Sequence, residues 1–138
     1  KLNILGTGPD LSRLKKKYEY DNIKFFGFLD NDEDLKFIKK SKVVVSATKL
    51  YEGQPSLLCE ASLNSVPIIF PDNGGIKEFL PKNYKFLYEQ SNYNSLQEAM
   101  NNIVNEDIEK IGKENYDFIS KLINKGKLLK VFSEAASE

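Results

Sequence analysis

Two carboxylates, Glu52 and Glu60, are the residues of this chain whose type and spacing best suit ligand binding or catalysis. They enclose seven residues, and Glu60 is the only charge between Gln54 and Pro71, although 29% of the chain is charged. A stretch so free of charge is typically covered on most sides, and a carboxylate inside it needs a partner. Carboxylates accept hydrogen bonds from sugar hydroxyls. The pair indicates a site for a hydroxylated ligand, unless Glu52 only complements a helix dipole and Glu60 faces solvent.

The backbone between these carboxylates is predicted to bind an anion. Pro55 suits the first position of a helix, so Gln54 becomes the N-cap, and Gln is a poor capping residue. The N–H groups of residues 56–58 are then left without a side-chain acceptor. A helix start of this kind, entered through the flexible Gly53, is typical of a phosphate site. A sugar that carries a phosphate would suit both features.

Strands and helices must hold these residues, and the sequence predicts that the two alternate. Strands are predicted at 2–5, 23–26, 43–45, 66–70 and 84–88, with helices between them. The β-branched run at 43–45 is typical of a strand buried on both faces. The alternation indicates an α/β, Rossmann-like, doubly wound and mostly parallel sheet with helices on both faces. Ligands of such sheets bind beyond the carboxyl ends of the strands, where Gly6, Gly27, Ser46 and Asp72 fall.

Four motifs, met in order along the chain, resemble one family. They are Leu-Gly-Thr-Gly-Pro at 5–9, Phe-Phe-Gly-Phe-Leu at 25–29, Glu-Gly-x-Pro with Leu-Leu-x-Glu-Ala at 52–61, and Asp-Asn-Gly-Gly-Ile-Lys-Glu at 72–78. Together they resemble the retaining glycosyltransferases of the GT-B fold, glycosyltransferase family 4 (glycosyl transferases group 1). The resemblance covers residues 1–90 and implies the C-terminal, donor-binding half of that fold.

The resemblance implies a role for each residue around the two carboxylates. Glu60 would bind the ribose hydroxyls, and Glu52 would orient the transferred sugar, which makes Glu52 the candidate catalytic residue. The diphosphate would be bound by the backbone of Gly53, Gln54, Pro55, Ser56 and Leu57. In the front-face mechanism usually proposed for the family, the departing phosphate accepts the proton of the acceptor.

The same resemblance implies that the N-terminal part of the chain meets the nucleotide. The turn with Gly6 and Gly8 would lie near the nucleotide, and the main chain of Leu29 would contact its base. The donor would be a UDP-, GDP- or ADP-sugar. No tightly bound cofactor and no metal site are expected.

The implied function is sugar transfer from a nucleotide-sugar to a glycan or lipid-linked acceptor. The family domain normally opens with a further strand and helix that carry an Arg and a Lys, and a separate N-terminal domain binds the acceptor. Both are expected to be missing here, so we expect no transferase activity from the isolated chain. A single nucleotide-sugar-binding domain over 1–138 is predicted, with a motif-bearing core at 1–90, packing helices at 93–132 and a frayed tail at 133–138.

The composition excludes several classes of function. The chain has no His, which excludes Ser-His-Asp and Cys-His catalysis and His-based zinc sites within it. Its net charge is zero, so no overall field attracts nucleic acid or an anionic membrane. The single Cys59 is predicted to be a buried core thiol in a reducing compartment. With no signal peptide or membrane span in view, we expect a cytoplasmic protein. The resemblance implies polysaccharide biosynthesis and peripheral association of the full-length protein with the inner face of the cell membrane.

Four other interpretations stay open from the sequence. The acidic run at 30–34 is the best support for a non-catalytic, flavodoxin-like interaction module, and it also allows a metal loop, although the spacing of a calcium loop is absent. A dinucleotide oxidoreductase would need a third glycine after Gly6 and Gly8, and that glycine is missing. An epimerase or phosphorylase built on GT-B halves is the nearest enzyme alternative.

Overall fold

The computed structural model describes residues 1–53, 55–124 and 126 of the chain. The chain divides into two units, of which unit 1 is Lys1–Phe37 and unit 2 begins at Ile38. Helix α2 (Asn31–Lys40) contains the boundary. The two units are described separately.

Unit 1 is built on two short parallel strands. Strand β1 (Leu2–Leu5) pairs with strand β2 (Ile23–Gly27), and both lie within a residue of the predicted ranges. Helix α1 (Leu11–Tyr18) connects them and packs against β2. Residues 9–10 form a turn just before the helix begins.

The acidic run at 30–34 has a structural role at the start of α2. The Glu33 N–H donates to Asp30 Oδ1 over 2.8 Å, and the Asp30 N–H donates to Glu33 Oε2 over 3.4 Å. This reciprocal arrangement is a capping box, which satisfies N–H groups that the helix itself cannot bond. No cluster of three or more potential metal ligands occurs in the part of the chain that the structure describes. The acidic run therefore supports a helix start rather than a metal loop.

Unit 2 contains a parallel sheet of three strands in the order β3-β4-β5. Strand β3 is Val44–Val45, β4 is Ile68–Pro71 and β5 is Leu87–Tyr88. Every residue of the central β4 is buried. The prediction that the valine run is buried on both faces is wrong, because β3 is an edge strand of this sheet and Val44 and Val45 are half-buried. The five predicted strands exist, but they divide between two parallel sheets.

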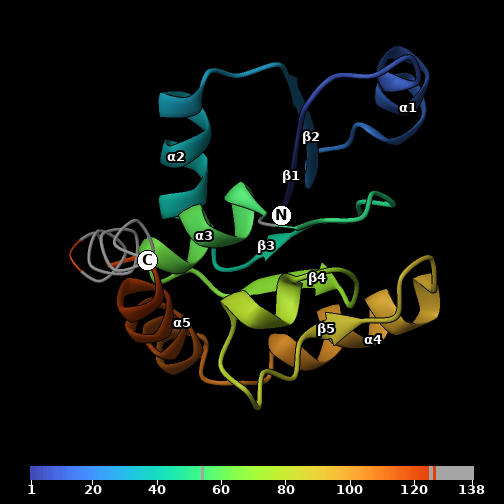
Figure 1. Cartoon of the computed structure of the whole chain (residues 1–138). Coiled ribbons are helices and arrows are strands. Elements are labelled where there is room, and N and C mark those ends of the chain that lie inside the picture. The colour runs from blue at the N-terminus through green and yellow to red at the C-terminus, as the bar shows by residue number, and fades with distance from the viewer. Residues whose placement is uncertain (54, 125, 127–138) are drawn as a thin grey trace. The chain divides into compact units, whose positions relative to one another are not determined.

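Helices cover both faces of the unit 2 sheet (Figure 1). Ile69 of β4 packs with Ala99 and Ile103 of helix α4 (Tyr93–Ile103). Because side chains alternate along a strand, Ile68 and Phe70 point to the other face, where helix α3 (Ser56–Leu63) contacts β4. Helix α5 (Ile108–Leu122) runs beside α3, and a 3-10 helix, η1 (Ile76–Phe79), follows β4. The predicted tail at 133–138 lies outside the described residues.

Helix α3 ends in a tight loop that closes its last turn. The Val66 N–H donates to the Ala61 carbonyl over 2.9 Å, and the Ser65 N–H donates to the Ser62 carbonyl over 3.0 Å. This is the Schellman pattern, which places the residue after the C-cap in the left-handed region. Here Ser65 has a φ of 57°, whereas Asn64 has a φ of −98°. By residue type Asn64 is the better candidate for the left-handed conformation, but the hydrogen-bond pattern of the loop fixes that conformation one residue later, at Ser65.

Gly112 lets α5 pack directly onto this loop. A Cβ atom at Gly112 would collide with the Ser65 carbonyl oxygen and would lie 3.3 Å from Pro67 Cδ. A glycine can break a helix, but α5 continues through Gly112, which is buried within it. The glycine is needed for close helix packing rather than for chain reversal.

Replacing Ser65 with glycine should stabilise the protein. Glycine adopts the left-handed conformation without the steric penalty of a Cβ, so Ser65→Gly should raise the free energy of unfolding by about 1 kcal/mol. The matched control is Ser120→Gly within α5, which should lower it by about 1 kcal/mol. Urea unfolding followed by circular dichroism measures both. Equal destabilisation by the two variants would contradict the strain at Ser65.

The hydroxyl of Tyr84 connects the chain before β5 to the start of β4. It donates to the Ile68 carbonyl over 2.6 Å and accepts from the Ile68 N–H over 3.0 Å. Burial raises the pKa of Tyr84 above its ordinary value, and the hydrogen bonding to the Ile68 backbone opposes that rise. The neutral hydroxyl is therefore the form that the fold favours.

Removal of this hydroxyl should destabilise the protein in a pH-dependent way. Tyr84→Phe leaves two backbone groups of Ile68 without this partner, so it should cost about 1–3 kcal/mol. Because the folded pKa is raised, the hydroxyl contributes its full stability below pH ~10 and loses it as pH rises further. The gap between wild type and variant in urea unfolding should shrink above pH ~10. Tyr116→Phe, at an exposed tyrosine of α5, is the control, and a gap that does not change with pH would contradict the assignment.

Candidate functional site

The start of α3 offers backbone N–H groups that the described protein leaves open. Pro55 is the N-cap, with extended backbone angles, and has no N–H. The first described helical hydrogen bond runs from the Cys59 N–H to the Pro55 carbonyl over 3.2 Å. Within the described residues, no hydrogen bond engages the N–H groups of Ser56, Leu57 and Leu58. The open amides stay a prediction, since Gln54 lies outside the described residues, and the position of Pro55 differs from the predicted one.

The correction at Pro55 shifts the helix start by one residue. The sequence predicts Gln54 as the N-cap and Pro55 as the first helical residue, and the structure begins the helix at Ser56 instead. Pro55 has a ψ of 109°, which is extended rather than helical. Gln54 lies outside the described residues. The change leaves the candidate anion site in place, because a proline N-cap has no side-chain acceptor to cover the amides.

Side-chain caps distinguish α3 from most of the other helices. Asp30, Asn92 and Asp107 accept N–H bonds at the starts of α2, α4 and α5 over 2.8–3.0 Å. Among the described α-helices, only α1 and α3 begin without a side-chain cap. These are the two helices that follow the Gly6–Gly8 and Glu52–Gly53 motifs. Helix starts without their own acceptors are suited to an anionic ligand.

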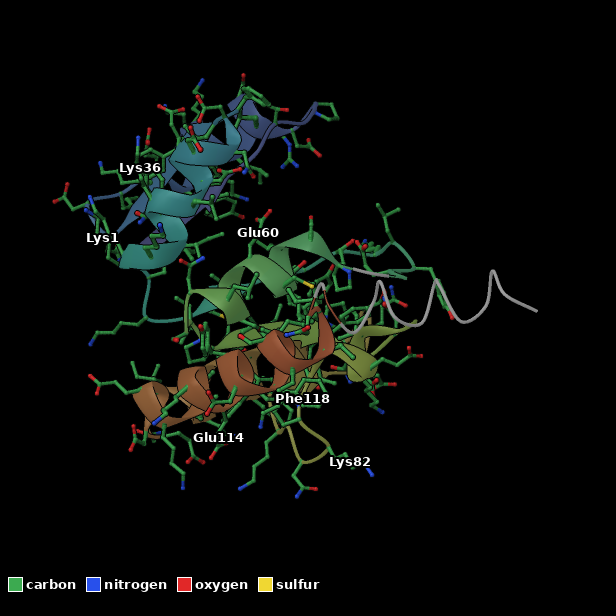
Figure 2. All side chains as sticks on the ribbon, turned by 60° about the vertical axis from the view of Figure 1, so that its left-hand side comes forward. Lys1, Lys36, Glu60, Lys82, Glu114 and Phe118 are labelled. Atoms are coloured by element: carbon green, nitrogen blue, oxygen red, sulfur yellow. The ribbon has the colours of Figure 1, made fainter. Side chains whose placement is uncertain are left out.

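Glu52 and Glu60 lie on either side of this helix start. Both residues are half-buried, and within the described residues neither carboxylate is hydrogen-bonded or ion-paired. Figure 2 shows Glu60 on the side of α3 that faces away from α5, while Glu114 projects from α5 on the opposite side. Glu60 is therefore neither occupied by a protein partner nor fully in solvent.

Two glycines bring the second predicted motif of unit 2, at 72–78, against Glu52. The Gly75 N–H donates to the Glu52 carbonyl over 3.0 Å, and Gly74 has a φ of 53°. A Cβ at Gly74 would collide with the Glu52 carbonyl oxygen, and one at Gly75 would lie 2.6 Å from the Gly53 carbonyl oxygen. Only a glycine pair lets the two loops approach this closely. The motifs at 52–55 and 72–78 thus form one cluster in unit 2.

Two amide side chains that the sequence analysis missed also hold this loop. Asn73 Nδ2 donates to the Leu50 carbonyl over 3.0 Å, and Gln90 Nε2 approaches the same oxygen at 3.5 Å. Asn73 lies inside a predicted motif, so its position was a usable signal. Gln90 lies 40 residues from Leu50 and carries no local pattern that would single it out.

The predicted site residues of unit 1 also meet at one edge of their sheet. Gly6 follows β1, Gly27 ends β2, and the Gly6 N–H donates to the Gly27 carbonyl over 2.7 Å. Both glycines have positive φ values, of 117° and 72°. Gly8 has open space around it, and Leu29 is half-buried. The structure therefore joins the ends of β1 and β2 through Gly6 and Gly27 and, within the described residues, shows no contact of Gly8 with either of them.

Cys59 is a core residue, as predicted. It is 9% exposed within α3, and burial raises the pKa of its thiol, with a further rise from the charge of Glu60. A thiol of this kind is a poor nucleophile at neutral pH. None of the helices within the described residues combines the length and apolar composition that a membrane span requires.

Comparison with protein-family models assigns the chain to a family. The model described as glycosyl transferases group 1 matches residues 1–127. This chain belongs to the glycosyl transferases group 1 family. A comparison with curated protein sequences finds no match.

Solved structures of similar fold agree with this family. Anabaena Alr3699/HepE in complex with UDP and glucose is 19% identical with a TM-score of 0.77, over 98% of this chain and 40% of that one. The same protein in complex with UDP-glucose is 20% identical with a TM-score of 0.74, over the same shares. Sucrose-phosphate synthase from Thermosynechococcus elongatus is 19% identical with a TM-score of 0.79, over 99% of this chain and 38% of that one.

These comparisons confirm the predicted fold class. The chain has the α/β, Rossmann-like architecture, with parallel strands and helices, of the C-terminal domain of the GT-B fold. It spans about two-fifths of the length of the structures it matches. Family membership favours a glycosyltransferase over a flavodoxin-like module or an oxidoreductase.

The packing of the Gly74–Gly75 turn against the Glu52 loop gives a direct prediction. Gly74→Ala adds a Cβ where Glu52 already lies and where φ is positive, so it should lower the free energy of unfolding by about 2 kcal/mol or more. Gly8→Ala is the control because its Cβ meets nothing within 4 Å, and its effect should stay within about 0.5 kcal/mol. Urea unfolding measures both. A neutral Gly74→Ala would contradict the close approach of the two loops.

Proposed function

We propose that this chain is the donor-binding domain of a retaining, family 4 hexosyltransferase. The protein would transfer a sugar from a nucleotide-sugar to a glycan or lipid-linked acceptor. The observation that carries this proposal is the start of α3. Among the described residues, no protein group bonds the N–H groups of Ser56, Leu57 and Leu58, which Glu52 precedes and Glu60 follows in the chain. Bound UDP and UDP-glucose in structures of the same fold support it.

The diphosphate would complete the start of α3. Backbone N–H groups and the positive end of the helix dipole favour a negative group at this position. Gly53 precedes the helix and has open space where a Cβ would be, so a ligand can approach its backbone closely. In this proposal Gly53, Gln54, Pro55, Ser56 and Leu57 form the diphosphate-binding backbone.

The two carboxylates would divide the hydroxyl groups of the donor between them. Glu60, on α3 one turn past the open amides, would accept hydrogen bonds from the ribose. Glu52, ahead of the helix, would accept bonds from the transferred sugar and hold its anomeric carbon toward the acceptor. Neither carboxylate has to give up another partner first, because neither is paired within the described residues.

The transfer itself would need no protein base. The bond between the anomeric carbon and the departing phosphate oxygen breaks, and a bond to the acceptor oxygen forms on the same face of the sugar. The departing phosphate takes the proton of the acceptor. The helix start would stabilise the negative charge that develops on this phosphate.

Unit 1 would bind the nucleotide part of the donor. The Gly6–Gly8 turn and the main chain of Leu29 would contact the nucleoside. The open space at Gly6 and Gly8 supports this, because neither would place a Cβ near another group. A role in polysaccharide biosynthesis in the cytoplasm, with peripheral contact to the membrane through a lipid-linked acceptor, belongs to the same proposal.

Substitutions of the two carboxylates should separate their roles. On the complete protein as its gene encodes it, Glu60→Gln should weaken binding of both the nucleotide and its sugar about tenfold or more, because it weakens hydrogen bonds to the ribose. Glu52→Gln should weaken binding of the nucleotide-sugar but leave the affinity for the free nucleotide unchanged. Calorimetry with UDP-, GDP- and ADP-glucose and the free diphosphates measures this.

Glu114→Gln is the matched control, because this exposed glutamate of α5 lies away from Glu60 (Figure 2). It should bind all ligands like the wild type. Failure of the wild type to bind any of the nucleotide-sugars would overturn the proposed function. Epimerised or phosphorolysed products in place of transfer would assign the protein to the neighbouring enzyme class.

A further inference from the structure

The backbone just before Glu52 is held by polar bonds rather than by packing. Leu50 and Tyr51 are 72% and 82% exposed, so their side chains do not anchor the loop. The Leu50 carbonyl instead accepts from Asn73 Nδ2 over 3.0 Å, with Gln90 Nε2 at 3.5 Å. Two residues later, the Glu52 carbonyl accepts from the Gly75 N–H. The loop is thus fixed at two carbonyls, both from the turn after β4.

We propose that Asn73 is a positioning residue that fixes the Glu52 loop for donor-sugar recognition. This inference rests on the proposed function, in which Glu52 binds the transferred sugar. Asn73 would not touch the donor. It would hold the Leu50 peptide, so that the Glu52 carboxylate is already in place when the donor binds.

The role of Asn73 differs from that of the glycines beside it. Gly74 and Gly75 make room for the loop, and their substitution should displace the backbone by collision. Asn73 contributes a directional hydrogen bond from its side chain. Its loss should leave the fold intact but allow the loop to move, because the Gly75 bond remains.

Folding stability by itself does not explain an asparagine at this position. Within the described residues, Asn73 Oδ1 is buried and has no hydrogen-bond partner. A buried acceptor without a partner is destabilising, and it offsets part of what the bond to Leu50 contributes. A residue without that oxygen would avoid this loss. The amide is better explained by the geometry that it imposes on the loop.

The test compares two substitutions at Asn73 with one matched control in the complete protein. Asn73→Ala removes the side-chain donor, and Asn73→Asp keeps the shape but places an oxygen against the Leu50 carbonyl. The control is Asn105→Ala, since Asn105 Nδ2 donates to the Asn101 carbonyl over the same 3.0 Å at an exposed site on the α4–α5 connection. Calorimetry gives the affinity for UDP-, GDP- or ADP-glucose, whichever the wild type binds, and for the corresponding diphosphate.

Asn73→Ala should weaken binding of the nucleotide-sugar about three- to tenfold and change the affinity for the free diphosphate by less than about twofold. Asn73→Asp should weaken binding of the nucleotide-sugar at least as much. The control should change neither. If the wild type binds a nucleotide-sugar but the Asn73 variants keep the wild-type ratio of the two affinities, this inference is wrong and the proposed function stands. An equal loss of affinity for the nucleotide-sugar and the free diphosphate would likewise show that Asn73 has only a structural role. If the wild type binds no nucleotide-sugar, the proposed function fails, and the inference fails with it.

Discussion

The close approach of two backbone segments is the constraint on which the unit 2 site depends. Gly74 and Gly75 lie against the carbonyls of Glu52 and Gly53, at a separation that leaves no room for a Cβ. The contact ties the loop after β3 to the loop after β4, both at the carboxyl ends of parallel strands. That edge is where parallel sheets bind ligands, because the helix starts converge there. The position of the Glu52 backbone therefore depends on a contact between main chains, to which the Asn73 side chain adds a hydrogen bond at Leu50.

The two ends of α3 differ in how their backbone groups without an intrahelical partner are satisfied. At the C-terminal end, the protein satisfies its carbonyls with the Val66 and Ser65 N–H groups, at the cost of a strained Ser65. At the N-terminal end, no side-chain cap is present among the described residues, although α2, α4 and α5 each have one. A helix end that stays open beside well-capped neighbours is consistent with a ligand that completes it.

Much of the fold was predictable because it follows from local pattern. Short apolar and β-branched runs predicted β1, β2 and β4, and a helix was expected within 93–132, where α4 lies. The local pattern failed where one residue's conformation depends on a distant partner. Ser65 rather than Asn64 is left-handed because the loop hydrogen bonds require it, and Gly112 continues a helix because α5 crosses the Ser65 carbonyl.

For the candidate site, the sequence by itself determined the chemical groups. The lack of His, the charge-poor stretch with Glu60, the proline at the helix start and the glycine motifs all stand in the order of residues. Only the tertiary structure decided which of these groups meet. Asn73 and Gln90 reach the Leu50 carbonyl from 23 and 40 residues away along the chain. The Gly75 N–H likewise reaches the carbonyl of Glu52, which is distant in the sequence. Contacts between distant segments leave no periodic trace in the sequence, because they depend on how strands and loops are placed rather than on which residues are neighbours along the chain.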